Sequence, residues 1–382
     1  MSETTRDGVQ EQVQDQAPMS AVSAAAKGRG TLARWLQLYW RVALLVVPLF
    51  LGVGCPCVRN HVNASPNLRW WLFSNFGANR MCPEMLKRGA PLKLSPDGNV
   101  IGRFFPVSCS QSVDDQSKTV TIHFGGTGYA WTPVAGRIGF SFDTAVEYRA
   151  DFFLAEDAVY VYAKTNRILT GPNFQVGAIE NKFVDIANKT PVGYLASTFG
   201  NQIVQSHLAS GFTVVHTDEG DEFALGILQP PQRPKKPFDT SKGDRYVFAN
   251  ETTEIRNNQV DFLGPFEVVD DDQALFLRMK LSGVAVDAMI YPRGVGDLWR
   301  DALQRGGVLS APVQPPIASF VVQPGAELRQ KFKLPKGQYY VVIDNSNVVG
   351  SVSPPWNPLA MVGGNAAILS YTSELGEDDD AF

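Results

Sequence analysis

The stretch AVYVYAKT at residues 158–165 indicates the fold class, because its residues alternate with the period of a β-strand. In an extended strand Val159 and Val161 face one side, while Tyr160 and Tyr162 face the other. Both faces of the strand are then apolar enough that we expect other parts of the protein to shield them from water. This pattern predicts a wall of a β-sandwich or a β-barrel.

Similar runs on both sides extend a β-rich domain over residues 116–228. Further strands are predicted at TVTIHF, RIGFSF, AVEYRADFF and FQVGAI (119–124, 137–142, 145–153 and 174–179). Leu195, Phe199 and Ile203 lie four residues apart and predict a helix near residues 191–209. FTVVHT (212–217) and EFALGIL (222–228) then predict a hairpin. HFGGTG (123–128) lacks the following helix that a phosphate loop needs, so it is predicted to be a loop between strands.

A linker and a second β-rich domain follow. Residues 229–243, QPPQRPKKPFDTSKG, hold four prolines and four basic residues, so they predict an extended linker. Residues 244–372 are expected to form a β-sandwich-like domain, and LPKGQYYVVIDNS (334–346) resembles the last strands of small extracellular β-sandwich modules. The remaining strands are expected at 274–279, 284–290, 317–322, 328–334 and 366–371.

One short helix is predicted inside the second domain, and a tail follows the domain. Asp297 is the expected N-cap, Gly306 lies just past the helix end, and the expected buried side is Leu298, Trp299, Ala302 and Leu303. The acidic tail at 373–382 is predicted to be disordered. The chain is therefore predicted to be mainly β, with two β-sandwich-like domains and one or two short helices, after a disordered N-terminus and a signal or anchor segment.

The N-terminal segment suggests where in the cell the protein is located. Residues 1–34 have few large apolar residues and are predicted to be disordered. A positive stretch ends at Arg41, and the apolar run VALLVVPLFLGVG fills Val42–Gly54 directly before Cys55. Because a membrane-spanning helix needs about 20 apolar residues, this shorter run favours a signal peptide or anchor at 35–54. A retained single-pass anchor and a buried core segment are the alternatives.

The end of this run resembles the lipobox of bacterial lipoproteins, since Gly52 and Gly54 lead straight into Cys55. The resemblance implies cleavage before Cys55 and lipidation of Cys55, which would anchor the protein to a membrane of the bacterial cell envelope. Gly52 stands where the lipobox usually has Leu. Pro56 follows the cysteine in place of the Asp that favours the inner membrane, so the outer membrane is the expected location.

Residues 55–115 are expected to form a connector or small subdomain that contains every cysteine of the chain. Cys82 and Cys109 enclose a turn-rich stretch and are the predicted disulfide pair in an oxidising compartment. On the chain-entropy account such a bond stabilises the fold by about 3.5 kcal/mol. Cys57 would be left over or would compete for either partner.

The chain offers little chemistry. Its net charge of −4 argues against a nucleic-acid partner. There is no Gly-x-Ser-x-Gly motif, and His123, His207 and His216 show no zinc-ligand spacing. We therefore predict no catalytic residue, no metal site and no cofactor. Trp131 and Trp356 are the candidate binding residues, because exposed Trp often marks a binding surface.

The functional hypothesis that follows is a membrane-tethered envelope lipoprotein. It would act as a non-catalytic binding or structural module for an envelope protein or a polysaccharide. The first alternative is a lipid carrier with an apolar cavity in the middle domain, between the sheet and the helix near 191–209. The second is an envelope hydrolase, for which the sequence shows no motif.

Overall fold

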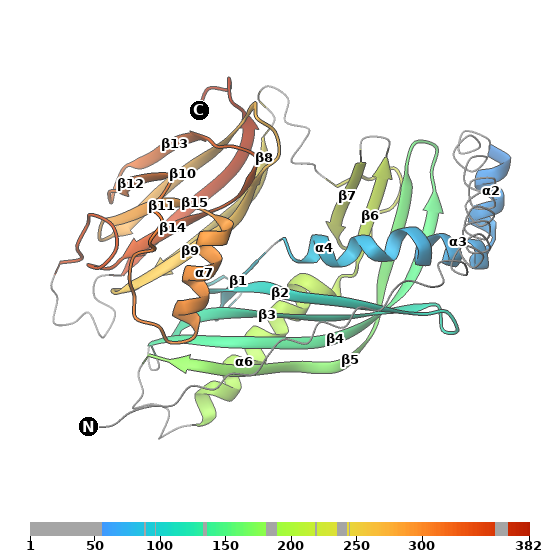
Figure 1. The fold of residues 1–382 in the computed structure, drawn as a ribbon, viewed down its shortest axis with the longest axis horizontal. Helices are drawn as coiled ribbons and strands as arrows, with labels where there is room; N and C mark the ends of the chain where they lie inside the picture. The colour runs from blue at the N-terminus through green and yellow to red at the C-terminus, as the bar shows by residue number, and fades with distance from the viewer. Residues whose placement is uncertain are drawn as a thin grey trace, which may run out of the picture. The chain divides into compact units, whose positions relative to one another are not determined.

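The computed structural model describes residues 56–382 except 88, 96, 133–135, 181–188, 218–219, 235–242, 244 and 356–365. This part of the chain is mainly β, with two sheets and few short helices, which confirms the predicted fold class (Figure 1). None of the helices in these ranges is long and apolar enough to cross a membrane. Residues Asn60–Phe382 form one compact unit. The predicted segments 1–34 and 35–54 lie outside the described residues, and the division at 229–243 stays a prediction.

The larger sheet has eleven strands. Its first half is an antiparallel succession of β2 (Val100–Asp114), β3 (Thr119–Thr132), β4 (Gly136–Leu154), β5 (Val159–Ile179), β6 (Phe212–Thr217) and β7 (Gly220–Leu225). The hairpin of β6 and β7 confirms the predicted one. On the other side of β2 come β8 (Tyr246–Ile255), β15 (Ala367–Glu377), β10 (Gln273–Gly283) and β13 (Glu327–Lys333), and the short β1 (Ala90–Lys93) also pairs with β2. The two halves meet at one parallel residue pair, Val100 with Thr253.

The smaller sheet has four strands in the order β12 (Ala318–Val322), β11 (Val286–Pro292), β14 (Gly337–Asn345) and β9 (Gln259–Val268). Alternate residues of these strands share a buried cluster with residues of β8, β10 and β15, among them Leu263, Leu277, Ile290, Val341 and Leu369. All of these are at most 1% exposed. Two β layers that bury a common apolar core form a β-sandwich.

The predicted short helix is longer than expected and buries a different face. Helix α7 runs over Arg293–Gln304, so Asp297 lies inside it and is not its N-cap. Trp299 and Leu303 are buried as predicted, but Leu298 is 77% exposed and Ala302 is exposed as well, which corrects the assignment of both to the buried side. Arg300 is buried instead. Its guanidinium lies 3.9 Å from the centre of the Phe105 ring, so a cation–π contact replaces the expected apolar one.

The predicted helix near 191–209 is present as α6 (Lys189–Val204), continued by a π-helical turn, η3 (Gln205–Ala209). Phe199, Ile203 and Leu208 are fully buried. Aromatic rings of the strands meet this helix, as in the stack of Phe140 on Phe199 at 6.4 Å between ring centres. In the part described, side chains of the helix and of the sheet thus pack against one another.

The glycine-rich segment HFGGTG is not a loop, because it lies inside β3. A Cβ atom on Gly126 would lie 2.2 Å from the carbonyl oxygen of Phe105, and one on Gly128 would lie 2.3 Å from the ring of Phe140. The glycines therefore let rings and backbone of the neighbouring strands approach β3 closely. Close approach, rather than a turn, explains their number.

The connector at 55–115 begins with short helical segments, α2 (Pro56–Ala64), α3 (Pro66–Leu72), η1 (Phe73–Gly77), η2 (Ala78–Arg80) and α4 (Met81–Met85). The hydroxyl of Ser65 accepts a hydrogen bond from the amide of Leu68 and caps α3. The predicted disulfide joins Cys82 of α4 to Cys109 of β2. It fixes the last of these helices to the larger sheet.

The prediction of a disordered acidic tail is wrong for the residues that the structure shows at its start. Strand β15 continues to Glu377 and pairs with β10 as far as Gln273. Beyond the strand, the carboxylate of Asp378 lies 2.7 Å from the amine of Lys333, and Asp380 is only 5% exposed. Lys331 and Lys333 of β13, together with Arg245 directly before β8, offset the negative charge that suggested disorder.

Candidate functional site

A cavity of about 220 Å³ lies where β2 and β8 diverge from their single paired position. The strands separate because β2 continues beside β3 while β8 continues beside β15. Residues from α4, β1, β2, β7, β8, β9, β14 and β15 line the cavity. Its volume is below the range of sites for drug-sized ligands, so it suits a small ligand or a single side chain.

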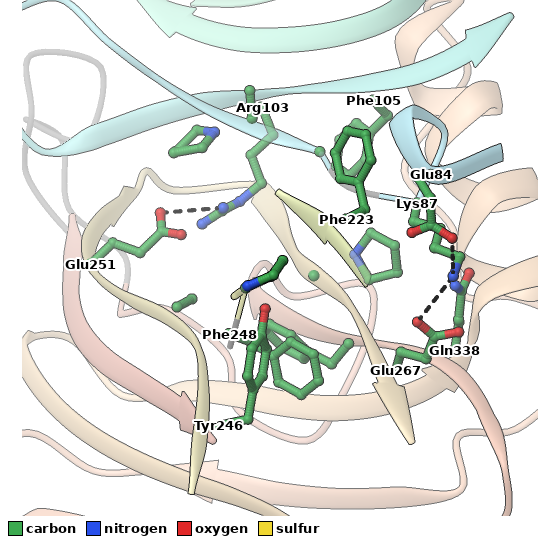
Figure 2. A pocket seen from close by; sticks show the side chains of 18 of the residues that line it. Glu84, Lys87, Arg103, Phe105, Phe223, Tyr246, Phe248, Glu251, Glu267 and Gln338 are labelled. Carbon is green, nitrogen blue, oxygen red and sulfur yellow. Dashed lines mark hydrogen bonds and ion pairs between the residues drawn. The ribbon is translucent and has the colours of Figure 1, made fainter. Parts of the chain in front are cut away.

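Aromatic rings form one wall of the cavity (Figure 2). Tyr246 and Phe248 of β8 both line the cavity, whereas Val247 between them does not. Their ring centres are 5.1 Å apart, and Phe248 lies 5.6 Å from Phe266 of β9. Phe105 and Phe223 add further rings from β2 and β7.

Ionic side chains line another part of the cavity. The amine of Lys87 lies 2.9 Å from the carboxylate of Glu84 and 3.9 Å from that of Glu267 (Figure 2). The side chains of these three residues are 30–38% exposed. Solvent screens such pairs, so their contribution to stability is small. They do determine the charge that a ligand would meet.

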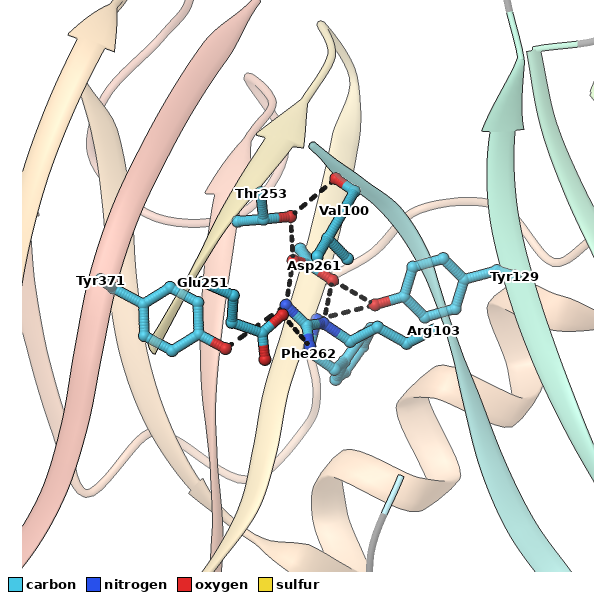
Figure 3. Close-up of polar contacts among 8 residues, drawn as sticks. All are labelled: Val100, Arg103, Tyr129, Glu251, Thr253, Asp261, Phe262 and Tyr371. Carbon is cyan, nitrogen blue, oxygen red and sulfur yellow. Dashed lines mark hydrogen bonds and ion pairs between the residues drawn. The ribbon is translucent and has the colours of Figure 1, made fainter. Parts of the chain in front are cut away.

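A buried polar network borders the cavity at Arg103 (Figure 3). The guanidinium of Arg103 donates two hydrogen bonds to Asp261, at 2.9 and 3.1 Å, and one to Glu251 at 3.3 Å. The hydroxyls of Tyr129 and Thr253 donate to Asp261 at 2.6 and 2.7 Å. Such a bidentate, fully hydrogen-bonded pair is the arrangement in which buried charges are tolerated.

The pKa values of this network indicate that its charges are kept. Burial raises the pKa of Asp261, but Arg103 and the two hydroxyl donors outweigh burial and hold this pKa below its usual value. Burial likewise lowers the pKa of Arg103, and Asp261 and Glu251 raise it well above its usual value. Burial raises the pKa of Tyr129 and of Tyr371, so both phenols stay protonated and can donate.

The hydrogen bonding of this network is that of a stabilising buried ion pair rather than of a reacting group. Each oxygen of Asp261 accepts from two donors, and the hydroxyl of Tyr129 also accepts from the amide of Phe262. A carboxylate held in this way is a weak base and a weak nucleophile. The open part of the cavity combines aromatic rings with partly exposed carboxylates, a lining that is suited to binding.

A second hollow, of about 210 Å³, lies on the face formed by β2, β3, β4 and β5. Ser110 is the cross-strand neighbour of His123, and Asp143 also lines this hollow. In the described part of the chain no hydrogen bond joins His123 to Ser110 or Asp143. The described residues also contain no group of three or more His, Cys, Asp or Glu placed to hold a metal ion.

Of the predicted site residues that lie in the described ranges, the structure brings Cys82 and Cys109 together. Trp131 is partly buried, and its ring lies 4.1 Å from the guanidinium of Arg256, so a packing contact covers one of its faces. It is not among the residues lining the 220 Å³ cavity. Cys55 and Trp356 lie outside the described residues, and Cys57 is an exposed free cysteine.

The cavity residues were missed because no strand was predicted over YVFANETTEI, which forms β8. The alternation of Tyr246 and Phe248 was the available signal, weakened by Asn250 and Glu251 in the same run. No pattern in the sequence indicated that Glu84, Lys87 and Glu267 would meet. These residues come from α4, the segment after it and β9.

Comparisons with known proteins give this chain no relatives. No family model matches it, and no curated protein matches it. Among solved structures, one match comes from work titled "Bacillus endospore appendages form a novel family of disulfide-linked pili". It covers 35% of this chain and 89% of that chain, at 10% identity and a TM-score of 0.18. A likeness at this level supports no argument about fold or function.

Proposed function

We propose that this protein is a non-catalytic binding module of the bacterial cell envelope, tethered to a membrane through Cys55, most simply the outer membrane. The observation that supports binding is the 220 Å³ cavity with its aromatic wall and its partly exposed carboxylates. Aromatic rings beside a few polar groups are typical of sites for ligands or partner side chains. The partner is an envelope component, a protein or a polysaccharide, part of which enters this cavity.

The tether is supported by the sequence alone, through the apolar run that ends at Cys55. Its test is the intact mass and the N-terminal sequence of the protein recovered from membranes. A chain that starts at Cys55 with the added mass of two or three acyl chains agrees with the proposal. A chain that keeps residues 1–54 contradicts lipidation and indicates a retained anchor.

The binding role is tested by photo-crosslinking in cells. A photoreactive phenylalanine analogue replaces Phe248, which faces the cavity, and in a matched variant replaces Val247, which is 51% exposed and neighbours it on β8. Because Phe248 lines the cavity and the exposed Val247 does not, only the first probe reaches a ligand in the cavity. We expect adducts with an envelope component at position 248 only. Equal adducts at both positions, or none, would contradict the proposal.

A further inference from the structure

We infer that the cavity accepts an ammonium group, and specifically the side chain of a lysine from a basic partner protein. This inference rests on the proposed binding function and adds the chemical class of the bound group. It follows from three properties of the described cavity residues: the excess of carboxylates, the state of the two cations, and the aromatic wall.

Carboxylates outnumber cations among the described residues that line the cavity. The cavity is lined by four carboxylates and two cations. The carboxylates are those of Glu84, Glu222, Glu251 and Glu267, and the cations are Lys87 and Arg103. A site lined by an excess of one charge attracts ligands of the opposite charge. Because the cavity also has apolar walls that displace water, this attraction is screened less than on an open surface.

Both cations already have two carboxylate neighbours each. Lys87 is shared by Glu84 and Glu267, and Arg103 by Asp261 and Glu251. An anionic ligand would have to compete with these carboxylates for the same donors. An ammonium group can donate hydrogen bonds to these carboxylates without displacing Lys87 or Arg103, because an ionised carboxylate has about four lone-pair sites for hydrogen-bond donors.

The aromatic wall suits the rest of a lysine side chain. Phe248 is partly buried and lies between Tyr246 and Phe266, so these rings offer apolar surface and electron-rich faces. A lysine carries its point charge on a flexible four-carbon stem. The stem can lie against the rings while the ammonium meets their faces and the carboxylates. The cavity volume of about 220 Å³ has room for one such side chain.

The test is a ligand titration of the full chain in detergent, in which saturation-transfer NMR measures binding. The probes are n-butylammonium, which mimics a lysine side chain, 1-butanol as its neutral counterpart, butyrate as the anion, and glucosamine as an amino sugar. We expect n-butylammonium to bind about three- to tenfold more tightly than 1-butanol. Its affinity should fall with added salt, and butyrate should not compete.

Two variants locate the effect. Glu267→Gln removes one charge but leaves Lys87 paired with Glu84 at 2.9 Å, and Phe248→Leu keeps an apolar side chain without the ring. Each should weaken n-butylammonium binding about three- to tenfold without a comparable change for 1-butanol. The control, Glu327→Gln, lies on β13 outside the cavity and should change neither.

Every outcome bears on the inference. Equal affinity for n-butylammonium and 1-butanol, tighter binding of butyrate, or a response to Glu327→Gln equal to that of Glu267→Gln would overturn it. Preference for glucosamine would point to a polysaccharide and would overturn the protein partner. If no probe binds while position 248 still crosslinks in cells, the ammonium class fails and the binding function stands. If neither occurs, both fail.

Discussion

At the scale of single residues, the most unusual group is the carboxyl of Asp344, which is 1% exposed. It lies on β14 opposite Asp287 of β11. Burial first, and then the charge of Asp287, raise the pKa of Asp344 to about 7. Asp287 itself accepts hydrogen bonds from the amides of Ser351 and Val352 and from the hydroxyl of Ser351. Asp287 therefore binds the segment that follows β14.

The pKa of Asp344 predicts a pH dependence of stability. The folded chain holds this proton up to about pH 7, whereas the unfolded chain releases it near pH 4. The unfolded state thus binds fewer protons in this window, and the free energy of unfolding falls as pH rises through it. Above pH 7 the loss is on the order of 4 kcal/mol.

Asp344→Asn should remove this dependence, because an amide stays neutral. We expect the variant to gain stability relative to wild type between pH 5 and pH 8, measured as the shift in urea midpoint. Asp97→Asn, in an exposed turn before β2, is the control and should shift little. A gain that is equal at both pH values would contradict the prediction.

At the scale of elements, the long strand β3 depends on its glycines. A Cβ on Gly128 would lie 2.3 Å from the ring of Phe140 and 2.6 Å from the carbonyl oxygen of Arg103. A Cβ on Gly171, which lies on β5 of the same sheet, would have nothing within 4 Å. The two glycines thus differ in surroundings while both lie in strands of one sheet.

Gly128→Ala should destabilise the protein by about 1–3 kcal/mol, because the added methyl group displaces an aromatic ring and a neighbouring strand. Gly171→Ala should change stability by less than about 1 kcal/mol, since the methyl group meets open space and reduces the freedom of the unfolded chain. Urea unfolding of both variants is the measurement. A similar loss in both would show that strand propensity rather than close approach governs β3.

At the scale of the whole molecule, the polar network at Arg103 joins the two halves of the larger sheet. Arg103 and Tyr129 belong to β2 and β3 of one half. Glu251 and Tyr371 belong to β8 and β15 of the other half, and Asp261 belongs to β9 of the smaller sheet. The backbone joins these halves through a single β2–β8 residue pair. Side-chain hydrogen bonds therefore supply much of the specific contact at this junction.

Arg103→Met should destabilise the chain by about 3–5 kcal/mol, since it leaves the carboxylate of Asp261 buried without its cation. We also expect the halves to uncouple, so that near-UV and far-UV circular dichroism give separate unfolding transitions. The double variant Arg103→Met with Asp261→Leu should recover most of the loss, because it removes both charges. Coincident transitions in the single variant would contradict the uncoupling.

The amino-acid sequence was enough to predict the mainly β class, most of the strands, the helix near 191–209 and the disulfide of Cys82 with Cys109. These features depend on alternation, helical spacing and a short cysteine separation, and local sequence records all three. The limits of that local information are visible in α7, where Leu298 is exposed and Arg300 is buried. Periodicity identifies an apolar face, but the neighbours Phe105 and Tyr340 determine that a cation can share it.

Four features could be found only from the folded structure. They are the glycine-rich strand β3, the ordered start of the acidic tail, the polar network at Arg103 and the cavity. Arg103 and Asp261 are 158 residues apart, and neither has a neighbour in sequence that indicates the other. The cavity likewise exists because β2 and β8 meet at one pair and then diverge. Such features depend on which strands become neighbours, and that choice is made by burial over the whole chain rather than by any segment.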